Sequence, residues 1–184
     1  MEMKNDMLGL KRGTVTLAEH QDSWQTEAEQ TIAELKRLLG NTAIDIQHIG
    51  STAISSIHAK PIIDIVVGVH APNDIIPYAE SLKLSHYIFR GEDVPGQLLF
   101  VKGDFESDIR THHIHVVKWN GPDWNNYIHF RDYLNAFPEK ARQYDRCKLN
   151  LAKQFPQERG RYTNGKQSLV SALLKEAELW KSNP

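Results

Sequence analysis

The sequence predicts an α+β fold, with a mixed β-sheet of about five strands, helices on one face and a C-terminal helical bundle. Three observations support this prediction. The run Ile62–Val67 is almost entirely β-branched, which is typical of a buried strand. Three further strand patterns within 87–118 follow one another across short turns, as in an antiparallel meander. The pattern over 123–180 changes to helical spacing, interrupted by prolines and a glycine.

The N-terminal region is predicted to hold one amphipathic helix. Residues 1–13 mix charges with glycine and are expected to form a tail or an edge segment, and 14–17 is expected to be a short strand. A helix is predicted next, starting from a capping pattern at Asp22, because apolar residues recur at helical spacing: Trp24, Ala28, Ile32, Leu35 and Leu39. Gly40 ends this pattern. The apolar stripe is expected to pack on the sheet.

The stretch over 44–69 is the centre of the predicted fold. Apolar and polar residues alternate over 44–47, which predicts a strand, and a Gly-Ser-Thr turn ends it. A helix of about two turns is expected over 52–58, and Pro61 then returns the chain to an extended form. The buried strand that follows carries one carboxylate, Asp64, which is costly to bury without a partner or a metal ion.

The second half of the chain is predicted from turn residues and periodicity. A second amphipathic helix is expected over 75–82. The strands and helices that follow are expected over 87–89, 98–101 and 111–118, and over 123–137, 139–155 and 162–180, respectively. At 184 residues the chain is expected to form a single domain, with an α/β core over 14–120 and a helical part over 121–181.

The composition indicates a chain with a substantial core and nearly balanced charge. It is 40% hydrophobic with a formal net charge of −1, so neither a nucleic-acid nor a membrane partner is expected. The single cysteine, Cys147, excludes an internal disulfide and a cysteine-based zinc site. No long apolar run opens the chain, so neither a signal peptide nor a transmembrane helix is expected, and the predicted location is the cytoplasm.

Positive charge is concentrated in the C-terminal third. Residues 138–166 hold eight Lys or Arg against three acidic residues, whereas 1–40 hold five basic and seven acidic residues. One interpretation is that the C-terminal helices place basic side chains above a cleft that binds an anion. The other is that they form an ordinary solvated face.

Three histidines fall within four residues of the strand predicted at 111–118. Because side chains alternate along a strand, His113 and His115 are predicted to face one side, with His112 on the core side beside Ile114. If the strands align, the first pair shares a cleft with Asp64. Such a set suits zinc, manganese or iron better than magnesium. The alternative is a pair of partly exposed histidines at a sheet edge, or histidines that make general contacts to phosphate.

The Gly-Ser-Thr turn is a candidate anion site. Gly50, Ser51 and Thr52 offer backbone N–H groups and hydroxyls to a phosphate, although helix capping alone would also explain them. Lys60 immediately precedes the buried strand and could neutralise a phosphate. His48 precedes the turn, where it would serve either as a further metal ligand or as a brace for the turn.

Several motifs resemble the GrpB family, a widespread bacterial family of small proteins that is also found fused to dephospho-CoA kinase. The motifs are HIGSTAI at 48–54, AKPIIDI at 59–65, RTHHIHVV at 110–117 and FRDYLNAFP at 130–138. The resemblance covers roughly residues 14–178. A Gly-Ser turn followed by Asp on a buried strand is also similar to the nucleotidyltransferase superfamily of the DNA polymerase beta kind. The GrpB motifs are the more specific of the two signals.

The resemblance implies a nucleotidyltransferase topology and a nucleotide or another phosphorylated small molecule as partner, bound with a divalent metal ion (Mg²⁺, Mn²⁺ or Zn²⁺). Asp64 would then be catalytic and would hold the ion that bridges a triphosphate. Four basic residues at positions that match the family would contact the phosphates: Arg110, Arg131, Lys148 and Lys166.

The chain departs from the superfamily at Val66, where active members usually carry a second carboxylate. Three functions therefore stay open: nucleotidyl transfer, a catalytically silent ligand-binding or regulatory module, and a metal-dependent phosphoester hydrolase that uses the histidines. An Asp at position 66 is expected to fold and to strengthen Mg²⁺ binding, because it would lie on the cleft side of the strand.

Overall fold

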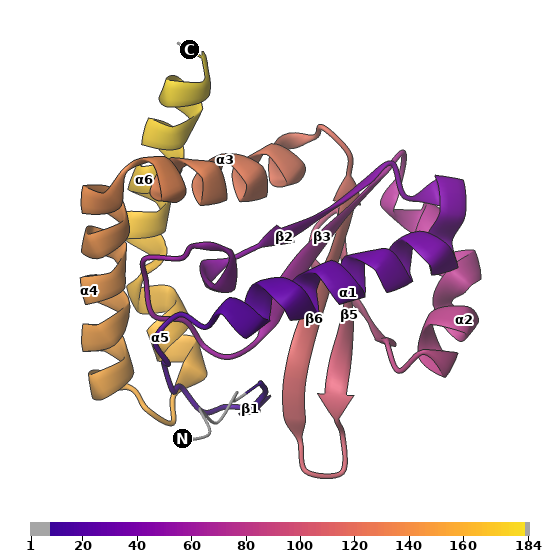
Figure 1. The fold of residues 1–184 in the computed structure, drawn as a ribbon, viewed down its shortest axis with the longest axis horizontal. Coiled ribbons are helices and arrows are strands. Elements are labelled where there is room, and N and C mark those ends of the chain that lie inside the picture. Colours follow the sequence, from indigo (N-terminus) through magenta and orange to yellow (C-terminus); the bar gives the residue numbers. More distant parts are fainter. Residues whose placement is uncertain (1–7, 183–184) are drawn as a thin grey trace.

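The computed structural model describes residues 8–182 and contains, within them, one mixed β-sheet flanked by helices (Figure 1). The main strands follow the order β2-β3-β6-β5-β4, and β1 pairs with one end of β6. Only β3 and β6 are parallel; the other pairs are antiparallel. The bounds are β1 Leu10–Lys11, β2 Asp45–Ile49, β3 Ile63–Val69, β4 Ile88–Val94, β5 Gln97–Asp104 and β6 Ile109–Lys118.

Helices account for most of the remaining described residues. They are α1 Asp22–Leu39, α2 Ala79–Leu84, α3 Pro122–Ala136, α4 Pro138–Gln154, α5 Arg159–Gly165 and α6 Gln167–Ser182. Short 3₁₀ turns occur at Gly40–Thr42 (η1), Ser51–Ala53 (η2) and Pro72–Tyr78 (η3). The predicted α+β class with a mixed sheet is therefore confirmed. No helix among the described residues has the length and apolar character needed to cross a membrane.

The main core lies between α1 and one face of the sheet. Helix α1 crosses the sheet in Figure 1 and buries its predicted apolar stripe, including Trp24, Ala28 and Leu35. Against it pack alternate residues of the central strands, such as Ile65 of β3 and Ile114 of β6. This burial of β-branched and aromatic side chains is the dominant force that holds the strands together.

The C-terminal helices form a second apolar cluster and cover part of the other sheet face. In the second cluster, Leu134 of α3, Tyr144 of α4 and Leu173 of α6 pack around Ile54 and Ile57. A third, smaller cluster joins Trp124 of α3 to residues of β2, β3 and β6. The helical part is therefore joined to the sheet by apolar contacts.

Two local predictions in the N-terminal half are wrong. Residues 14–17 form no strand; the chain there makes single contacts instead, with the Val15 amide donating to the Pro156 carbonyl and Ala18 bridging Ala59. Residues 52–58 do not form a helix of two turns, since only the 3₁₀ turn η2 is present. The rest of that segment is fixed by side-chain packing, because Ile54 and Ile57 are buried among the C-terminal helices.

Other boundaries moved by a few residues. The final helix predicted over 162–180 is two helices, α5 and α6, which meet at Lys166. The hairpin β4–β5 has longer strands than predicted, with a turn at Pro95 and Gly96. Of the N-terminal segment predicted as a tail or an edge, Leu10–Lys11 is the edge strand β1, and 1–7 lies outside the described residues.

Candidate metal centre and anion cavity

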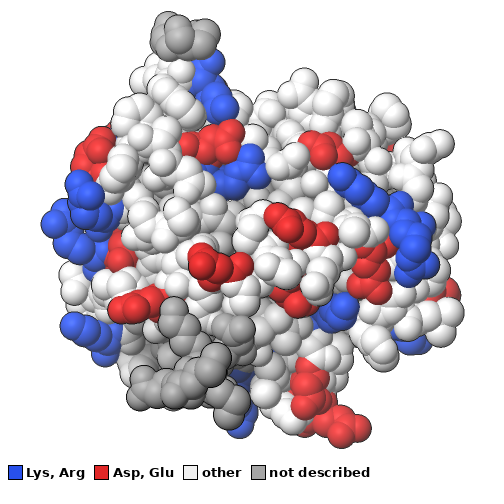
Figure 2. Space-filling view, in the orientation of Figure 1, with Lys and Arg blue, Asp and Glu red and all other residues white. Residues whose placement is uncertain are grey.

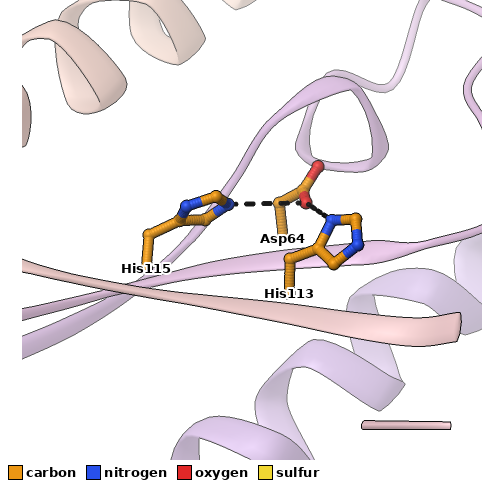
Figure 3. Close-up of side chains that lie close together, drawn as sticks. All are labelled: Asp64, His113 and His115. Atoms are coloured by element: carbon orange, nitrogen blue, oxygen red, sulfur yellow. Dashed lines mark hydrogen bonds and ion pairs between the residues drawn. The ribbon is translucent and has the colours of Figure 1, made fainter. Parts of the chain in front are cut away.

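Asp64, His113 and His115 point toward one another from β3 and β6 (Figure 3). In the parallel register, Asp64 lies opposite His113, and Val66 lies opposite His115. Asp64 Oδ1 is 3.1 Å from His113 Nδ1 and 3.8 Å from His115 Nε2. One ligand atom from each of the three residues lies within 4.8 Å of the others. The predicted parity of the histidines and their shared cleft with Asp64 are thus confirmed.

The histidines keep Asp64 ionised. Burial by itself would raise the pKa of Asp64, but hydrogen bonds and charge interactions with His113 and His115 outweigh it and hold the pKa well below its usual range. Gly50 approaches this carboxylate so closely that a Cβ there would lie 2.5 Å from Asp64 Oδ2, and its φ of +72° favours glycine. The glycine of the turn therefore makes room for the carboxylate.

A cavity of about 250 Å³ opens beside this cluster. The turn Gly50–Thr52 forms part of its wall, and Lys60, Arg159 and Lys166 place three basic side chains on it. The amine of Lys60 lies 5.6 Å from the centre of the Tyr162 ring, and that of Lys166 lies 5.0 Å from the same ring. A cluster of metal-ligand type and a cluster of positive charge thus line one cavity.

The surroundings of Lys60 disfavour the protonated form of its amine. Burial, followed by the positive charges of Arg159 and Lys166, lowers the pKa of Lys60 to about 7. A bound anion would relieve both effects, because it replaces lost solvation and offsets the like charges. The cavity is therefore better suited to an anion than to a neutral ligand.

His48 braces the turn from the side away from the cavity. Its Nε2 lies 2.9 Å from Thr52 Oγ1, and its Nδ1 lies 3.3 Å from Gln25 Oε1. Burial lowers the pKa of His48 to about 4, so the ring is neutral at pH 7. Both ring nitrogens have protein partners, and His48 is not part of the metal-type cluster. Of the two roles predicted for it, the geometry favours bracing, and the Thr52 hydroxyl is used in the same contact.

Three of the predicted phosphate ligands lie outside the cavity. Arg110 is 3.2 Å from Asp108 Oδ1 and lies over the Phe105 ring, near the β5–β6 turn. Arg131 donates to Gln47 Oε1 and to the His48 carbonyl and so ties α3 to β2. Lys148 is fully buried and donates to the His58 carbonyl. Arg131 and Lys148 thus tie helices to other elements, whereas the contacts of Arg110 are local to the β5–β6 turn.

Much of the positive charge of α4 also faces solvent. Arg142 and Arg146 are exposed, and Figure 2 shows basic side chains along the edge of the molecule where α4 lies in Figure 1. Of the eight basic residues in 138–166, only Arg159 and Lys166 line the cavity. Four of the eight are exposed, so the solvated face is the better interpretation for half of these basic residues.

The position of the missing carboxylate is occupied by an apolar contact. Val66 lies on the same face as Asp64 but is fully buried with Ile49, Val117 and Trp124 beneath α3. The expectation that an Asp at position 66 would lie on the cleft side is not met, because the position is fully buried in an apolar cluster that includes Trp124. His115, its neighbour in the parallel register, is the side chain that reaches the cavity instead.

Comparison with known proteins identifies the family. The sequence model of the GrpB protein family matches residues 14–176. The chain belongs to the GrpB family. The glutamate-rich protein GrpB of Alkalihalophilus pseudofirmus is 40% identical over 173 residues, which cover 92% of this chain and 99% of that protein. The UPF0157 protein YqkA of Bacillus subtilis is 33% identical over 163 residues, which cover 88% of this chain and 47% of that protein.

Solved structures agree with this assignment. The crystal structure of the conserved protein GrpB from Enterococcus faecalis matches with a TM-score of 0.82 at 28% identity and covers 90% of this chain and 99% of that one. A structure of the Cid1 poly(U) polymerase with MgGTP bound matches with a TM-score of 0.50 at 12% identity, over 73% of this chain and 44% of that one. The second likeness shows a nucleotidyltransferase-like fold.

Sequence reasoning missed the aromatic wall of the cavity. Tyr127 and Phe130 come from α3, Tyr144 from α4 and Tyr162 from α5, and all four line it. The helical spacing of these residues does not distinguish a cavity wall from an ordinary core position. Only the rotation of each helix against the sheet decides which of them border the cavity.

The donor set fits a divalent ion. Two imidazole nitrogens and one carboxylate oxygen are ligands that Zn²⁺ and Mn²⁺ accept, whereas Mg²⁺ prefers oxygen ligands alone. The neighbouring basic residues add no oxygen ligands, so remaining coordination positions would be left for water or for phosphate oxygens. The chemistry of the cluster thus favours an ion of the zinc or manganese type.

Proposed function

We propose that the cavity binds a phosphorylated small molecule, with nucleotides as the first candidates, together with a divalent metal ion on Asp64, His113 and His115. The observation that carries this proposal is the common wall: the metal-type cluster lies beside Lys60, Arg159 and Lys166 in one cavity. Each group is explained by the same ligand, since phosphate oxygens bind both metal ions and cations.

Different residues of the cavity would neutralise the charge of the ligand, contact its phosphates and exclude water. Lys60, Arg159 and Lys166 would neutralise phosphate charge, and the turn Gly50–Thr52 would add backbone contacts at the cavity wall. The 3₁₀ turn is too short to supply much helix dipole, so side-chain cations carry the electrostatic attraction. An ion on the cluster would supply further positive charge at the phosphate. The aromatic wall would exclude water from one side of the ligand.

Nucleotidyl transfer is the reaction that we propose for an active form of this site. The support comes from the nucleotidyltransferase-like fold and from Asp64, which the two histidines keep ionised as a metal ligand. In such a transfer the chain would act through positioning and charge neutralisation rather than through covalent chemistry. The cytoplasm is the compartment that we propose for it, where nucleotides are available.

A silent ligand-binding module is the second candidate, favoured by a specific observation. Asp64 is the only carboxylate that lines the cavity among the described residues, and Val66 is buried in an apolar cluster with Trp124. A transferase of this fold usually relies on more than one carboxylate to hold its ions. The same cavity could bind its ligand without catalysing a reaction, and the protein would then act as a sensor of that ligand.

The test is thermal shift and calorimetry with a panel of nucleoside triphosphates, in Mg²⁺, Mn²⁺ or Zn²⁺. We expect binding that requires Mn²⁺ or Zn²⁺ and that Asp64→Asn reduces by about 10-fold or more. Asp74→Asn is the matched control, because Asp74 lies outside the cavity and accepts a hydrogen bond from the Ala71 amide at the start of η3, which an Asn oxygen can also accept. Equal Mn²⁺ binding by wild type and Asp64→Asn would contradict the proposed metal site. The absence of any response across the panel would contradict the proposal that the ligand is a nucleotide.

A further inference from the structure

A buried amide stands behind one of the proposed metal ligands. Gln97, at the start of β5, is 4% exposed, and its Nε2 lies 3.3 Å from His115 Nδ1. His115 pairs with Leu99 across the β5–β6 ladder, so Gln97 is its diagonal neighbour on the same face. The nitrogen of His115 that faces away from Asp64 therefore meets a protein group rather than water.

Two neighbours fix the orientation of this amide. The Tyr127 hydroxyl donates to Gln97 Oε1 at 2.8 Å, and Asp93 Oδ1 lies 3.5 Å from Gln97 Nε2. A carboxylate can only accept a hydrogen bond, so it selects the NH₂ side of the amide, and the hydroxyl takes the carbonyl side. With both ends assigned, the second N–H of Gln97 points at His115.

This orientation determines which ring nitrogen of His115 carries the proton. Because Gln97 donates to Nδ1, a neutral His115 must hold its proton on Nε2, the nitrogen that lies 3.8 Å from Asp64. A metal ion on Nε2 needs the lone pair of that nitrogen, so the proton has to move to Nδ1. A proton on Nδ1 would face the N–H of the Gln97 amide, which is also a donor, so the arrangement is unfavourable unless another group accepts that proton.

The Tyr127 hydroxyl is the group in position to accept it. Its oxygen lies 3.5 Å from His115 Nδ1, and its own proton is already directed at Gln97 Oε1. The hydroxyl can therefore accept from His115 without losing its present hydrogen bond. Gln97 opposes the metal-binding form of the ring, and Tyr127 permits it.

We propose that Gln97 and Tyr127 are positioning residues that set the tautomer of His115, and through it the affinity of the Asp64–His113–His115 cluster for a divalent ion. The second half of this proposal rests on the proposed function, because it needs an ion at the cluster. Partners behind a histidine ligand typically change metal affinity by about 10- to 100-fold. In this chain the two partners act in opposite directions.

The first experiment reads the tautomer without any ion. Two-bond ¹H–¹⁵N correlation spectra of the metal-free protein, with His115 assigned by comparison with His115→Asn, should show the proton on Nε2. Replacing the donor by an acceptor in Asp93→Asn/Gln97→Glu should move it to Nδ1; the first change removes the carboxylate that would repel the new one. A proton already on Nδ1 in the wild type would overturn the proposal.

The second experiment measures affinity with MnCl₂ and ZnCl₂ by calorimetry. We expect Asp93→Asn/Gln97→Glu to bind about 10-fold more tightly and Tyr127→Phe about 10-fold more weakly than wild type. Tyr133→Phe is the matched control: it lies on the same helix, but its hydroxyl donates to Glu176, so neither tautomer nor affinity should change. Unchanged affinities in both test variants would overturn the metal half of the proposal. If no variant bound an ion while the tautomer followed Gln97, the proposed function would fail and the proton placement would stand.

Discussion

Lys60 holds its amine in a place that suits a charge only when an anion is present. Its pKa is lowered to about 7 by burial and by Arg159 and Lys166, and a phosphate beside it would raise that pKa again. Below pH 7 the amine is already protonated, so binding needs no proton. Above pH 7 the free protein has lost the proton, and binding has to restore it.

We therefore expect anion affinity to fall as pH rises above 7, by up to about tenfold per pH unit. Inorganic tripolyphosphate with Mn²⁺ is a suitable probe, and calorimetry in buffers of different ionisation enthalpy would report the proton taken up. Because the probe titrates as well, the informative quantity is the difference from Lys60→Met. A slope that is the same in both proteins would show that Lys60 does not contact the anion.

At this scale, strand alternation predicted the metal-type cluster correctly. Asp64, His113 and His115 were placed together correctly, since alternation along two neighbouring strands fixes their side of the sheet. Arg131 and Lys148 were not, since each lies on a helix whose rotation is set by packing. A basic residue in a family motif can therefore have a structural role, in which it links two elements, instead of binding a ligand.

The contact between α3 and β3 decides what position 66 can hold. Val66 and Trp124 pack together in a small apolar cluster with Ile49 and Val117, and this cluster closes the sheet face next to the cavity. The same contact explains why sequence reasoning about the strand alone failed there: alternation gave the correct face, but the covering helix comes from a different part of the chain.

Val66→Asp is accordingly expected to destabilise the protein by about 3 kcal/mol, because it buries a carboxylate without a partner. Chemical denaturation with the linear extrapolation would measure it. Val66→Thr is the matched control, since it keeps the shape and adds only a hydroxyl, and a smaller loss is expected. An Asp variant as stable as wild type, with tighter Mg²⁺ binding, would mean that α3 readily moves off the strand.

In the segment 52–58, contacts from other parts of the chain likewise override the prediction for a whole element. Its sequence permits a helix, and a helix was predicted, but Ile54 and Ile57 are instead anchored among α3, α4 and α6. The His58 amide and ring also contact Asp145 of α4, at 2.8 Å each. Tertiary contacts of this kind override a weak local propensity.

On the scale of the whole molecule, the cavity lies where the sheet and the C-terminal helices meet. Its metal-type cluster belongs to β3 and β6, and its basic and aromatic walls come largely from α3, α4 and α5. The apolar cluster around Trp124 joins the same two parts. The single domain predicted from chain length stays a prediction, and these shared contacts support it.

We expect one cooperative unfolding transition. Tryptophan fluorescence, which includes Trp180 of α6, and far-UV circular dichroism should give coincident midpoints in denaturant. A ligand that binds both parts should raise the two midpoints together. As a control, Trp180→Phe should alter the fluorescence amplitude but not the coincidence. Two separated midpoints would instead divide the chain into two independently folding units.

The parallel pairing of β3 with β6 has a consequence for how the chain can be altered. Asp64 and His113 are 49 residues apart in sequence, yet they are ladder neighbours, and the intervening chain makes an excursion through α2 and the β4–β5 hairpin. The tip of that hairpin, at Pro95 and Gly96, is exposed and does not line the cavity. Closing a longer loop costs only about 0.6 kcal/mol for each doubling of its length. An insertion at the hairpin tip should therefore cost little folding free energy. Because Gln97 directly follows the tip and contacts His115, such an insertion would nevertheless act on the candidate metal centre through that residue.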